Sequence, residues 1–246
     1  MKALVIIPTY NEKDNIVDLV EQIQAHTRGY DVSILIVDSH SPDGTGEVAD
    51  QISRQNSKVH VFHQTKKLGL GKAYLDGFRW ALNCNCDAIV TMDADFSHDP
   101  CYIPQLLGQL GSYDFIIGSR YAPGGAVVNW PLHRRLLSRF ANAYARTLIG
   151  IGLRDLTNAY QCFPHRFLRI LLEPELRSTG YAFLIEFKLR FLMRHARVLE
   201  IPIIFKDRTR GESKVSKRVI FESAFRVWQF AMERRFGNRW KEQRKN

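Results

Sequence analysis

The first half of the sequence alternates short apolar runs with amphipathic segments, and few folds are compatible with this order. Residues 3–7 form a continuous apolar run, as expected of a strand that is buried on both faces of a sheet. Residues 15–24 follow, with apolar side chains from Ile16 to Ile23 at helical spacing. Because the same order then repeats with short links, the sequence predicts an α/β fold: a Rossmann-like, mostly parallel sheet with helices on both faces.

The later elements of this half continue the alternation. Strands are expected at residues 33–37, 59–62, 88–92 and 115–118, and helices at 45–54, 71–82 and 103–110. Ligands of open parallel sheets bind beyond the carboxyl ends of the strands. Polar clusters occupy four of these ends, at residues 8–12, 38–41, 93–95 and 119–121. We therefore expect the four clusters to form one site at a single edge of the sheet.

The second half of the sequence has a different character. We expect a loop at residues 124–131, a basic amphipathic helix at 134–148, an irregular segment at 154–163, a helix at 185–194 and a charged loop at 206–217. Residues 199–205 are predicted to form a strand, and Pro202 within it favours a place at the edge of a sheet. These boundaries assign residues 1–217 to one domain and 218–246 to a C-terminal tail.

Asp93 and Asp95 stand two residues apart, directly after the apolar run of residues 88–92. On an extended segment, residues i and i+2 point to the same side, so both carboxylates can approach one ion or divide between an ion and a ribose. Hard cations such as Mg²⁺ and Mn²⁺ prefer oxygen ligands and often combine one or two carboxylates with substrate phosphates. A solvated turn at a strand end is the alternative. The three neighbouring polar clusters favour the metal interpretation.

The other clusters divide into structural and functional parts. Asp38 ends a strand and can accept hydrogen bonds from a nucleoside base, whereas residues 42–44 have turn composition and Thr45 is expected to cap the next helix. Residues 66–72 place two glycines between lysines, which indicates only a flexible basic loop because a Walker loop has other spacing. Residues 208–214 offer cations for phosphate, or else a solvated run of charge. His40 and His98 lie near the site in the sequence and are interpreted as structural or peripheral, not catalytic.

Charge and cysteine usage restrict the partners. The formal net charge of +10 favours anionic partners: nucleic acid, an acidic membrane surface or phosphorylated substrates. No run is long and apolar enough for a transmembrane helix, and the four cysteines are expected to be free thiols in the cytoplasm. The tail joins apolar and aromatic residues to a cluster of cations, which suits an anionic bilayer surface. The alternative for the tail is a helix that packs on the domain and leaves its basic end solvated.

The motifs, taken in order, resemble those of family 2 glycosyltransferases, and more closely those of dolichol-phosphate (polyprenol-phosphate) mannose synthases. The resemblance extends from about residue 2 to about residue 217, and it rests on residues 8–12, 37–38, 41–45, 68–71, 93–95, 118–121, 155–157, 207–208 and 211–214. It implies a GT-A catalytic domain that transfers mannose from GDP-mannose to a polyprenyl phosphate, with inversion and with Mg²⁺ or Mn²⁺. It also implies a location on the cytosolic face of a membrane, with small membrane subunits as potential partners and without nucleic acid.

The resemblance also implies roles for individual positions. The residues implied to surround the nucleoside of the donor are Pro8, Tyr10, Glu12, Val37, Asp38 and Ser39. Those implied to hold ribose, metal and diphosphate are Asp93, Ala94 and Asp95, with Asp95 as the main metal ligand and Ser97 beside the metal. The cations implied to bind the donor phosphates are Arg120, Arg208 and Lys214, and Arg134 is implied to face the acceptor phosphate.

Two positions depart from the pattern that the resemblance implies. Ser39 stands where the family often has a second aspartate, which affects the choice of base. Residues 158–161 stand where Ser-Gly-Phe-Arg or a similar stretch is usual, so Gln161 takes the place of an arginine, which affects the preference for sugar or acceptor. The alternatives are therefore a UDP-sugar donor (glucose or an N-acetylhexosamine) or another lipid-linked acceptor on the same fold. A basic module that binds nucleic acid or membrane without catalysis is a third hypothesis, but it leaves the acidic pair unexplained.

Overall fold

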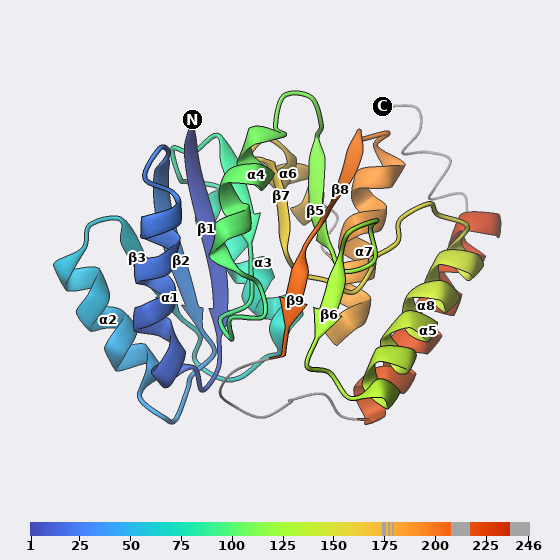
Figure 1. The fold of residues 1–246 in the computed structure, drawn as a ribbon, viewed down its shortest axis with the longest axis horizontal. Helices are drawn as coiled ribbons and strands as arrows, with labels where there is room; N and C mark the ends of the chain where they lie inside the picture. The colour runs from blue at the N-terminus through green and yellow to red at the C-terminus, as the bar shows by residue number, and fades with distance from the viewer. Residues whose placement is uncertain (174–175, 177, 179, 208–216, 237–246) are drawn as a thin grey trace.

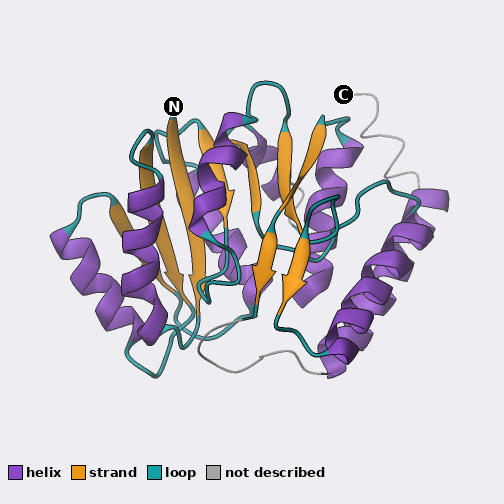
Figure 2. Ribbon diagram, viewed as in Figure 1, coloured by secondary structure: helices purple, strands orange, loops and turns teal. Residues whose placement is uncertain are grey.

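A seven-stranded sheet forms the centre of the molecule, and helices cover both of its faces (Figures 1 and 2). The computed structural model describes residues 1–173, 176, 178, 180–207 and 217–236. The strand order is β3-β2-β1-β4-β7-β5-β8, in which β7 is antiparallel to both of its neighbours and the other pairs are parallel. The predicted mostly parallel α/β fold is therefore confirmed.

The first half follows the predicted alternation closely. Its strands are β1 (Lys2–Thr9), β2 (Asp31–Asp38), β3 (Val59–His63), β4 (Ala88–Thr91) and β5 (Phe115–Ser119). Its helices are α1 (Lys13–His26), α2 (Thr45–Gln55), α3 (Leu70–Ala81) and α4 (Ile103–Gly108), the last preceded by a 3₁₀ turn at Pro100–Tyr102. One detail was wrong: Gly44, with φ of 92°, occupies the N-cap position of α2, and Thr45 is the first helical residue.

The second half contains β6 (Ala126–Val128), α5 (Leu132–Ile149), β7 (Gln161–Pro164), α6 (Phe167–Leu172), α7 (Gly180–Met193), β8 (Val198–Pro202), β9 (Ile204–Lys206) and α8 (Lys217–Phe236). Three expectations are corrected here. The segment expected to be irregular contains β7, the expected loop at 124–131 contains β6, and the single strand expected at 199–205 is two strands. β8 ends at Pro202 on the sheet edge, as the proline indicated, whereas β9 pairs with β6 in a separate two-stranded sheet.

Apolar side chains lie on both faces of each central strand, which explains the continuous apolar runs of the sequence. In β1, Leu4 and Ile6 join the core on the side of α3 and α7, whereas Val5 and Ile7 join the core on the side of α1 and α4. These two cores are the layers above and below the sheet. Because both faces of these strands are covered by apolar side chains, polar functional residues are placed at the strand ends.

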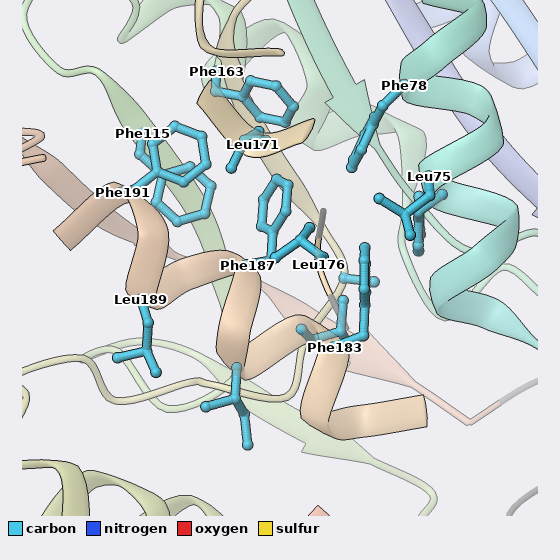
Figure 3. Packing of buried hydrophobic residues seen from close by; sticks show 14 of the residues in the cluster. Leu75, Phe78, Phe115, Phe163, Leu171, Leu176, Phe183, Phe187, Leu189 and Phe191 are labelled. Carbon is cyan, nitrogen blue, oxygen red and sulfur yellow. The ribbon is translucent and has the colours of Figure 1, made fainter. Parts of the chain in front are cut away.

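Aromatic rings dominate the core between the sheet and α7 (Figure 3). Phe183, Phe187 and Phe191 follow one another at four-residue intervals on α7 and point toward the sheet. The ring of Phe191 stacks on that of Phe115 in β5, with centroids 4.0 Å apart. The ring of Phe163 in β7 meets Phe187 edge-on at 5.5 Å. Such pairs favour specific ring geometry, so this cluster fixes α7 against β5 and β7.

Candidate functional site

The carboxyl ends of β1, β2, β4 and β5 lie along one edge of the sheet, at the lower end of the molecule in Figure 1. The parallel register places Thr9 opposite Asp38 and Ile6 opposite Thr91. The polar clusters that follow these strands are therefore brought to the same edge, as expected. This edge is where ligands bind in open α/β sheets.

Three loops at this edge each contain a non-glycine residue with a positive φ angle. The residues are Asn11 after β1, His40 after β2 and Phe96 after β4, with φ of 55°, 57° and 61°. Asparagine tolerates this left-handed conformation, but a bulky phenylalanine adopts it at a cost of about 1–3 kcal/mol. Such strain persists where the surrounding structure imposes it, and it is typical of binding sites. The sequence pattern did not reveal this feature.

The Asp38 carboxylate closes the turn that follows β2. It accepts hydrogen bonds from the backbone N–H of Ser41 at 3.1 Å and from the Ser41 hydroxyl at 2.5 Å, and a weaker one from the Thr9 hydroxyl at 3.4 Å. Asp38 and Ser39 are both buried, at 3% and 5% exposed. Asp38, which the resemblance implies as a nucleoside contact, thus also has a structural role, because its hydrogen bonds fix the conformation of the loop.

The other residues expected around a nucleoside lie next to this turn. Pro8 and Val37 are register partners at the buried ends of β1 and β2. The ammonium of Lys67 lies 3.6 Å from the centre of the Tyr10 ring, a cation–π contact that joins the basic loop to the site. Glu12 accepts a hydrogen bond from the Asn15 amide at 2.8 Å, within the first turn of α1.

The loop after β4 holds the acidic pair in two different environments. The Asp93 side chain is 33% exposed and accepts a weak hydrogen bond from the Tyr74 hydroxyl at 3.4 Å. Burial, together with the Asp93 charge, raises the pKa of Tyr74 well above its ordinary value. Asp95 is buried and accepts hydrogen bonds from the Ser97 hydroxyl at 2.5 Å and the Ser97 N–H at 3.1 Å. Ala94, between them, is buried.

His98 supports this loop through hydrogen bonds, which agrees with its interpretation as a structural residue. Its ring is fully buried, and its Nδ1 accepts a hydrogen bond from the Asp93 N–H at 2.9 Å. The proton therefore resides on Nε2, which donates to Asn158 Oδ1 at 2.5 Å. The Asn158 amide in turn donates to the carbonyl of Gly118 in β5. A continuous chain of hydrogen bonds thus joins the acidic loop to the end of β5.

Arg120, expected to bind donor phosphate, forms a buried ion pair with Asp155. Its Nε and Nη2 donate to the two carboxylate oxygens at 2.8 and 2.7 Å, and Nη2 also donates to the Thr157 hydroxyl at 2.7 Å. Burial raises the pKa of Asp155, but the Arg120 charge and hydrogen bonds outweigh it, so the pKa lies below its ordinary value. Arg120 is only 6% exposed. Its contact with a donor stays a prediction.

Lys188 is a buried residue that the sequence analysis missed. Its Nζ donates to the carbonyls of Asn158 at 2.6 Å and Leu156 at 3.2 Å. Burial lowers its pKa to about 7, and the Asp155 charge opposes this shift. Two of its N–H groups are used by backbone carbonyls of the segment that follows Asp155. The available signal was a lysine in the middle of an apolar helix.

Of the three other cations predicted to bind phosphate, only Arg134 lies in the described part of the chain, close to the two-stranded sheet of β6 and β9. Arg134 Nη1 donates to Asp207 at 2.8 Å, and its guanidinium covers the Trp130 ring at 4.0 Å. This pair joins the first turn of α5 to the chain after β9. Arg208 and Lys214 lie outside the described residues. The sequence prediction for these two positions therefore has no structural counterpart here.

The acidic pair fits a divalent cation that a phosphorylated ligand helps to bind. Within the described part of the chain, no group of three or more histidine, cysteine, aspartate or glutamate side chains could hold a metal ion. Asp93 and Asp95 supply two carboxylates, and Mg²⁺ is commonly bound by one or two carboxylates plus substrate phosphates. A diphosphate would complete such a site, so the donor set suits Mg²⁺ or Mn²⁺.

The sheet, with polar clusters along its carboxyl edge, defines the class of fold: the GT-A fold. Solved structures of glucosyl-3-phosphoglycerate synthase from Mycobacterium tuberculosis resemble this chain over 95% of its length and 79% of theirs. One of them, named as a complex with Mn²⁺, UDP-glucose and phosphoglyceric acid, superposes with a TM-score of 0.67 at 17% sequence identity. At this identity the likeness concerns the fold alone.

The chain belongs to glycosyl transferase family 2, whose sequence profile matches residues 4–171. It is 39% identical to the undecaprenyl-phosphate mannosyltransferase of Micrococcus luteus, over 96% of both chains. It is 42% identical to the polyprenol monophosphomannose synthase of Mycolicibacterium smegmatis, over 95% of this chain and 88% of that protein. It is 37% identical to the dolichol-phosphate mannosyltransferase of Pyrococcus furiosus, over 90% of this chain but 61% of that longer protein.

Proposed function

We propose that this protein transfers mannose from GDP-mannose to a polyprenyl phosphate such as dolichyl phosphate, with inversion at the anomeric carbon and with Mg²⁺ or Mn²⁺. The observation that carries the proposal is the similarity, over 95–96% of the chain, to two proteins named for the mannosylation of polyprenyl phosphates. The loop with Asp93 and Asp95 supports it, because its donor set suits a metal-bound diphosphate.

The chemistry of this transfer depends on charge more than on proton transfer. A phosphate oxygen of the acceptor attacks the anomeric carbon, the bond from that carbon to the diphosphate breaks, and GDP leaves. The attacking phosphate is already anionic near pH 7, so a strong general base is not required. Two anionic groups must nevertheless approach each other, and positive charge at the site has to stabilise them. A bound divalent cation would supply part of that charge by coordinating the diphosphate.

The chain's own residues then have three tasks. Asp93 and Asp95 hold the cation, and Ser97 orients Asp95 through two hydrogen bonds. Asp38 and the loops after β1 and β2 surround the nucleoside. Arg120, Arg134, Arg208 and Lys214 balance the phosphate charges of donor and acceptor. We further place the protein in the cytoplasm, peripheral on the cytosolic face of a membrane, where small membrane subunits are potential partners.

A UDP-sugar donor is the second candidate, and Ser39 is the observation that favours it. The residue is buried, and its N–H donates to the Thr9 carbonyl at 2.9 Å, so it lies in the floor of the expected nucleoside site. Gln161 is also buried, in β7, and its amide donates to the Asn158 carbonyl at 2.9 Å. A serine in place of an acidic residue changes the hydrogen bonds that are available to a base.

Transfer of radiolabelled sugar into the lipid phase tests the proposal. GDP-mannose, UDP-glucose and UDP-N-acetylglucosamine would each be supplied with polyprenyl phosphate, with and without Mg²⁺ or Mn²⁺. We expect metal-dependent label from GDP-mannose only. Label from a UDP-sugar and none from GDP-mannose would instead establish the second candidate. Absence of transfer from all three donors would refute both.

A further inference from the structure

Helix α5 exposes the apolar side chains that such a helix normally buries. Leu132, Leu136 and Phe140 follow at four-residue intervals, so they form one stripe, and they are 69%, 58% and 68% exposed. Leu137 and Leu148 widen the stripe on one side. The face of α5 that packs on the domain is smaller: it buries Asn142, Ala145 and Ile149. An amphipathic helix of a water-soluble domain turns its apolar face inward, and α5 turns most of its apolar surface outward.

A row of arginines borders this stripe on its other side. Arg135, Arg139 and Arg146 are all exposed and recur on one flank of the helix. The sequence of α5 holds four arginines and no acidic residue. The exposed side of α5 therefore combines an apolar band with a cationic band. This combination is typical of helices that lie in the plane of an anionic membrane interface.

Helix α8 extends the apolar band. It packs beside α5, where the Tyr144 hydroxyl donates to the Ala224 carbonyl at 3.4 Å, and both helices form one end of the molecule (Figure 1). Phe225, Trp228 and Met232 share one face of α8 and are 57%, 48% and 39% exposed. We use the name α5–α8 face for the exposed apolar residues of both helices: Leu132, Leu136, Leu137, Phe140, Leu148, Phe225, Trp228 and Met232.

We propose that the α5–α8 face lies in the headgroup layer of an anionic lipid bilayer, with its apolar side chains among the acyl chains and the three exposed arginines of α5 on lipid phosphates. Charge complementarity favours an anionic bilayer as the binding partner, because the charged residues of α5 are all basic and anionic lipids carry the opposite charge. Among the described residues, no helix is long and apolar enough to cross a membrane. The sequence analysis considered only the tail for this task, whereas the structure points to α5 as the larger part.

The orientation that follows suits a lipid acceptor, and in this respect the inference rests on the proposed function. Both helices begin at the end of the molecule where the parallel strands finish (Figure 1). Arg134, in the first turn of α5, pairs with Asp207, immediately before the segment with Arg208. Docking through the α5–α8 face would therefore bring the edge with Asp93 and Asp95 near the plane of the lipid phosphates.

Vesicle sedimentation of the full chain tests this surface. One variant removes apolar contact (Leu136→Ser with Phe140→Ser), and another removes charge (Arg135, Arg139 and Arg146 each →Gln). At about 1 kcal/mol per basic residue, the charge variant should bind vesicles of phosphatidylglycerol and phosphatidylcholine about 100-fold more weakly than the parent. The apolar variant should lose at least about tenfold on the same vesicles. Higher salt should appreciably weaken vesicle binding by the parent and by the apolar variant, which keep the arginines, but not by the charge variant.

A matched control places the same kinds of change on the opposite side of the molecule. Val17→Ser with Arg54→Gln alters exposed positions of α1 and α2, far from α5 in Figure 1, and should leave vesicle binding unchanged. Equal binding by all variants would overturn the proposal. A parent dimer in light scattering that both α5 variants convert to monomer would also overturn it, because the face would then join two copies.

A comparison of two acceptors separates this inference from the proposed function. With a short, water-soluble polyprenyl phosphate, the α5 variants should keep the parent's rate. With a long-chain acceptor in anionic vesicles, they should lose at least about tenfold, in line with their binding. Rates that fall equally on both acceptors would refute the docking role. If the parent transfers sugar to neither acceptor, the proposed function is refuted. The vesicle-binding measurements still test, independently of activity, whether the α5–α8 face docks on a membrane.

Discussion

Buried polar residues hold the acidic loop in place through hydrogen bonds. His98 Nδ1 accepts a hydrogen bond from the Asp93 N–H, and its Nε2–H donates to the side-chain oxygen of Asn158. Lys188 donates to the backbone carbonyl of Asn158. The pattern of carboxylates near a strand end was readable in the sequence. The supporting residues were not, since His98 and Asn158 are 60 positions apart and only the folded sheet brings them together.

Replacement of Asp95 by asparagine should abolish most transfer without loss of the fold. The amide oxygen can still accept the two hydrogen bonds of Ser97, but the charge that holds a cation is lost. We expect the rate of transfer to fall by about 10²–10³-fold. Asp99→Asn is the matched control, because Asp99 caps the following 3₁₀ turn by accepting from the Cys101 N–H and should retain most activity. Full activity of Asp95→Asn would refute the metal assignment.

Lys188 should make stability depend on pH. Its pKa is about 7 in the folded chain and about 10.5 unfolded, so between these values the unfolded chain binds more protons and the free energy of unfolding rises with pH. From pH 7.5 to 9.5 this group should contribute a rise of about 2 kcal/mol. Urea unfolding of the parent and of Lys188→Met at both pH values measures the difference. The same rise in both proteins would mean that Lys188 is not the source.

Elements with strong periodicity were predictable, and short elements that depend on distant partners were not. β1, β2, α1 and α3 are 8 to 14 residues long, and each contains a hydrophobic pattern that is sufficient to predict a strand or a helix. β7 has four residues and ends in Pro164, yet it fills a central place because β4 and β5 both offer it backbone partners. β6 and β9 have three residues each and are strands only because they pair with each other.

The stability of the fold at the end of β5 should depend on the buried ion pair between Arg120 and Asp155. Removal of one partner leaves an uncompensated buried charge, so Arg120→Met should cost about 3–5 kcal/mol in the free energy of unfolding. Addition of Asp155→Leu should recover most of this loss, because an apolar pair replaces the ions. Thermal or urea unfolding of the single and double variants measures both effects. Sugar transfer by the stable double variant then separates a phosphate contact from a purely structural role.

Close packing of α3 on β1 should make Gly77 intolerant of a side chain. A Cβ at this position would lie 2.7 Å from Ile6 Cγ2 and 3.2 Å from Val37 Cγ2. We expect Gly77→Ala to destabilise the protein by about 1–3 kcal/mol, although alanine favours helix. Gly108→Ala in α4 is the control, since its nearest neighbour is the Tyr30 hydroxyl at 4.0 Å, and it should be neutral or stabilising. Equal unfolding temperatures for the two variants would contradict this view of α3.

At the scale of the whole molecule, charge and apolar surface are separated by position. The acidic pair lies at the carboxyl edge of the sheet, and the exposed apolar band and arginines lie along α5 at the end of the molecule. The net charge of +10 was evident from composition, but composition does not distribute charge over a surface. The sequence of residues 134–148 predicts a basic amphipathic helix but does not show what its apolar side faces. Only the fold shows which of its sides faces out.

A nucleotide and a metal should stabilise the whole protein jointly. If Asp93 and Asp95 bind a cation through a diphosphate, then GDP with Mn²⁺ should raise the unfolding temperature more than the two separate shifts combined. At a ligand concentration of about 100 times Kd, the gain in unfolding free energy should be about 2.7 kcal/mol. Asp95→Asn should remove this joint effect. Additive shifts in the parent protein would contradict a shared site.

The sequence by itself determined the α/β class, the order of most elements and the edge at which polar clusters gather, because these follow from short-range periodicity and from the rule that parallel strands end together. It also contains, in order, the motifs that resemble those of family 2 glycosyltransferases. The tertiary structure alone decided the insertion of β7, the burial of Arg120 against Asp155, the contacts of Lys188 and the outward apolar face of α5. The first three depend on contacts with residues far away in the chain, and the last depends on which side of α5 packs on the domain. Short-range sequence patterns report neither.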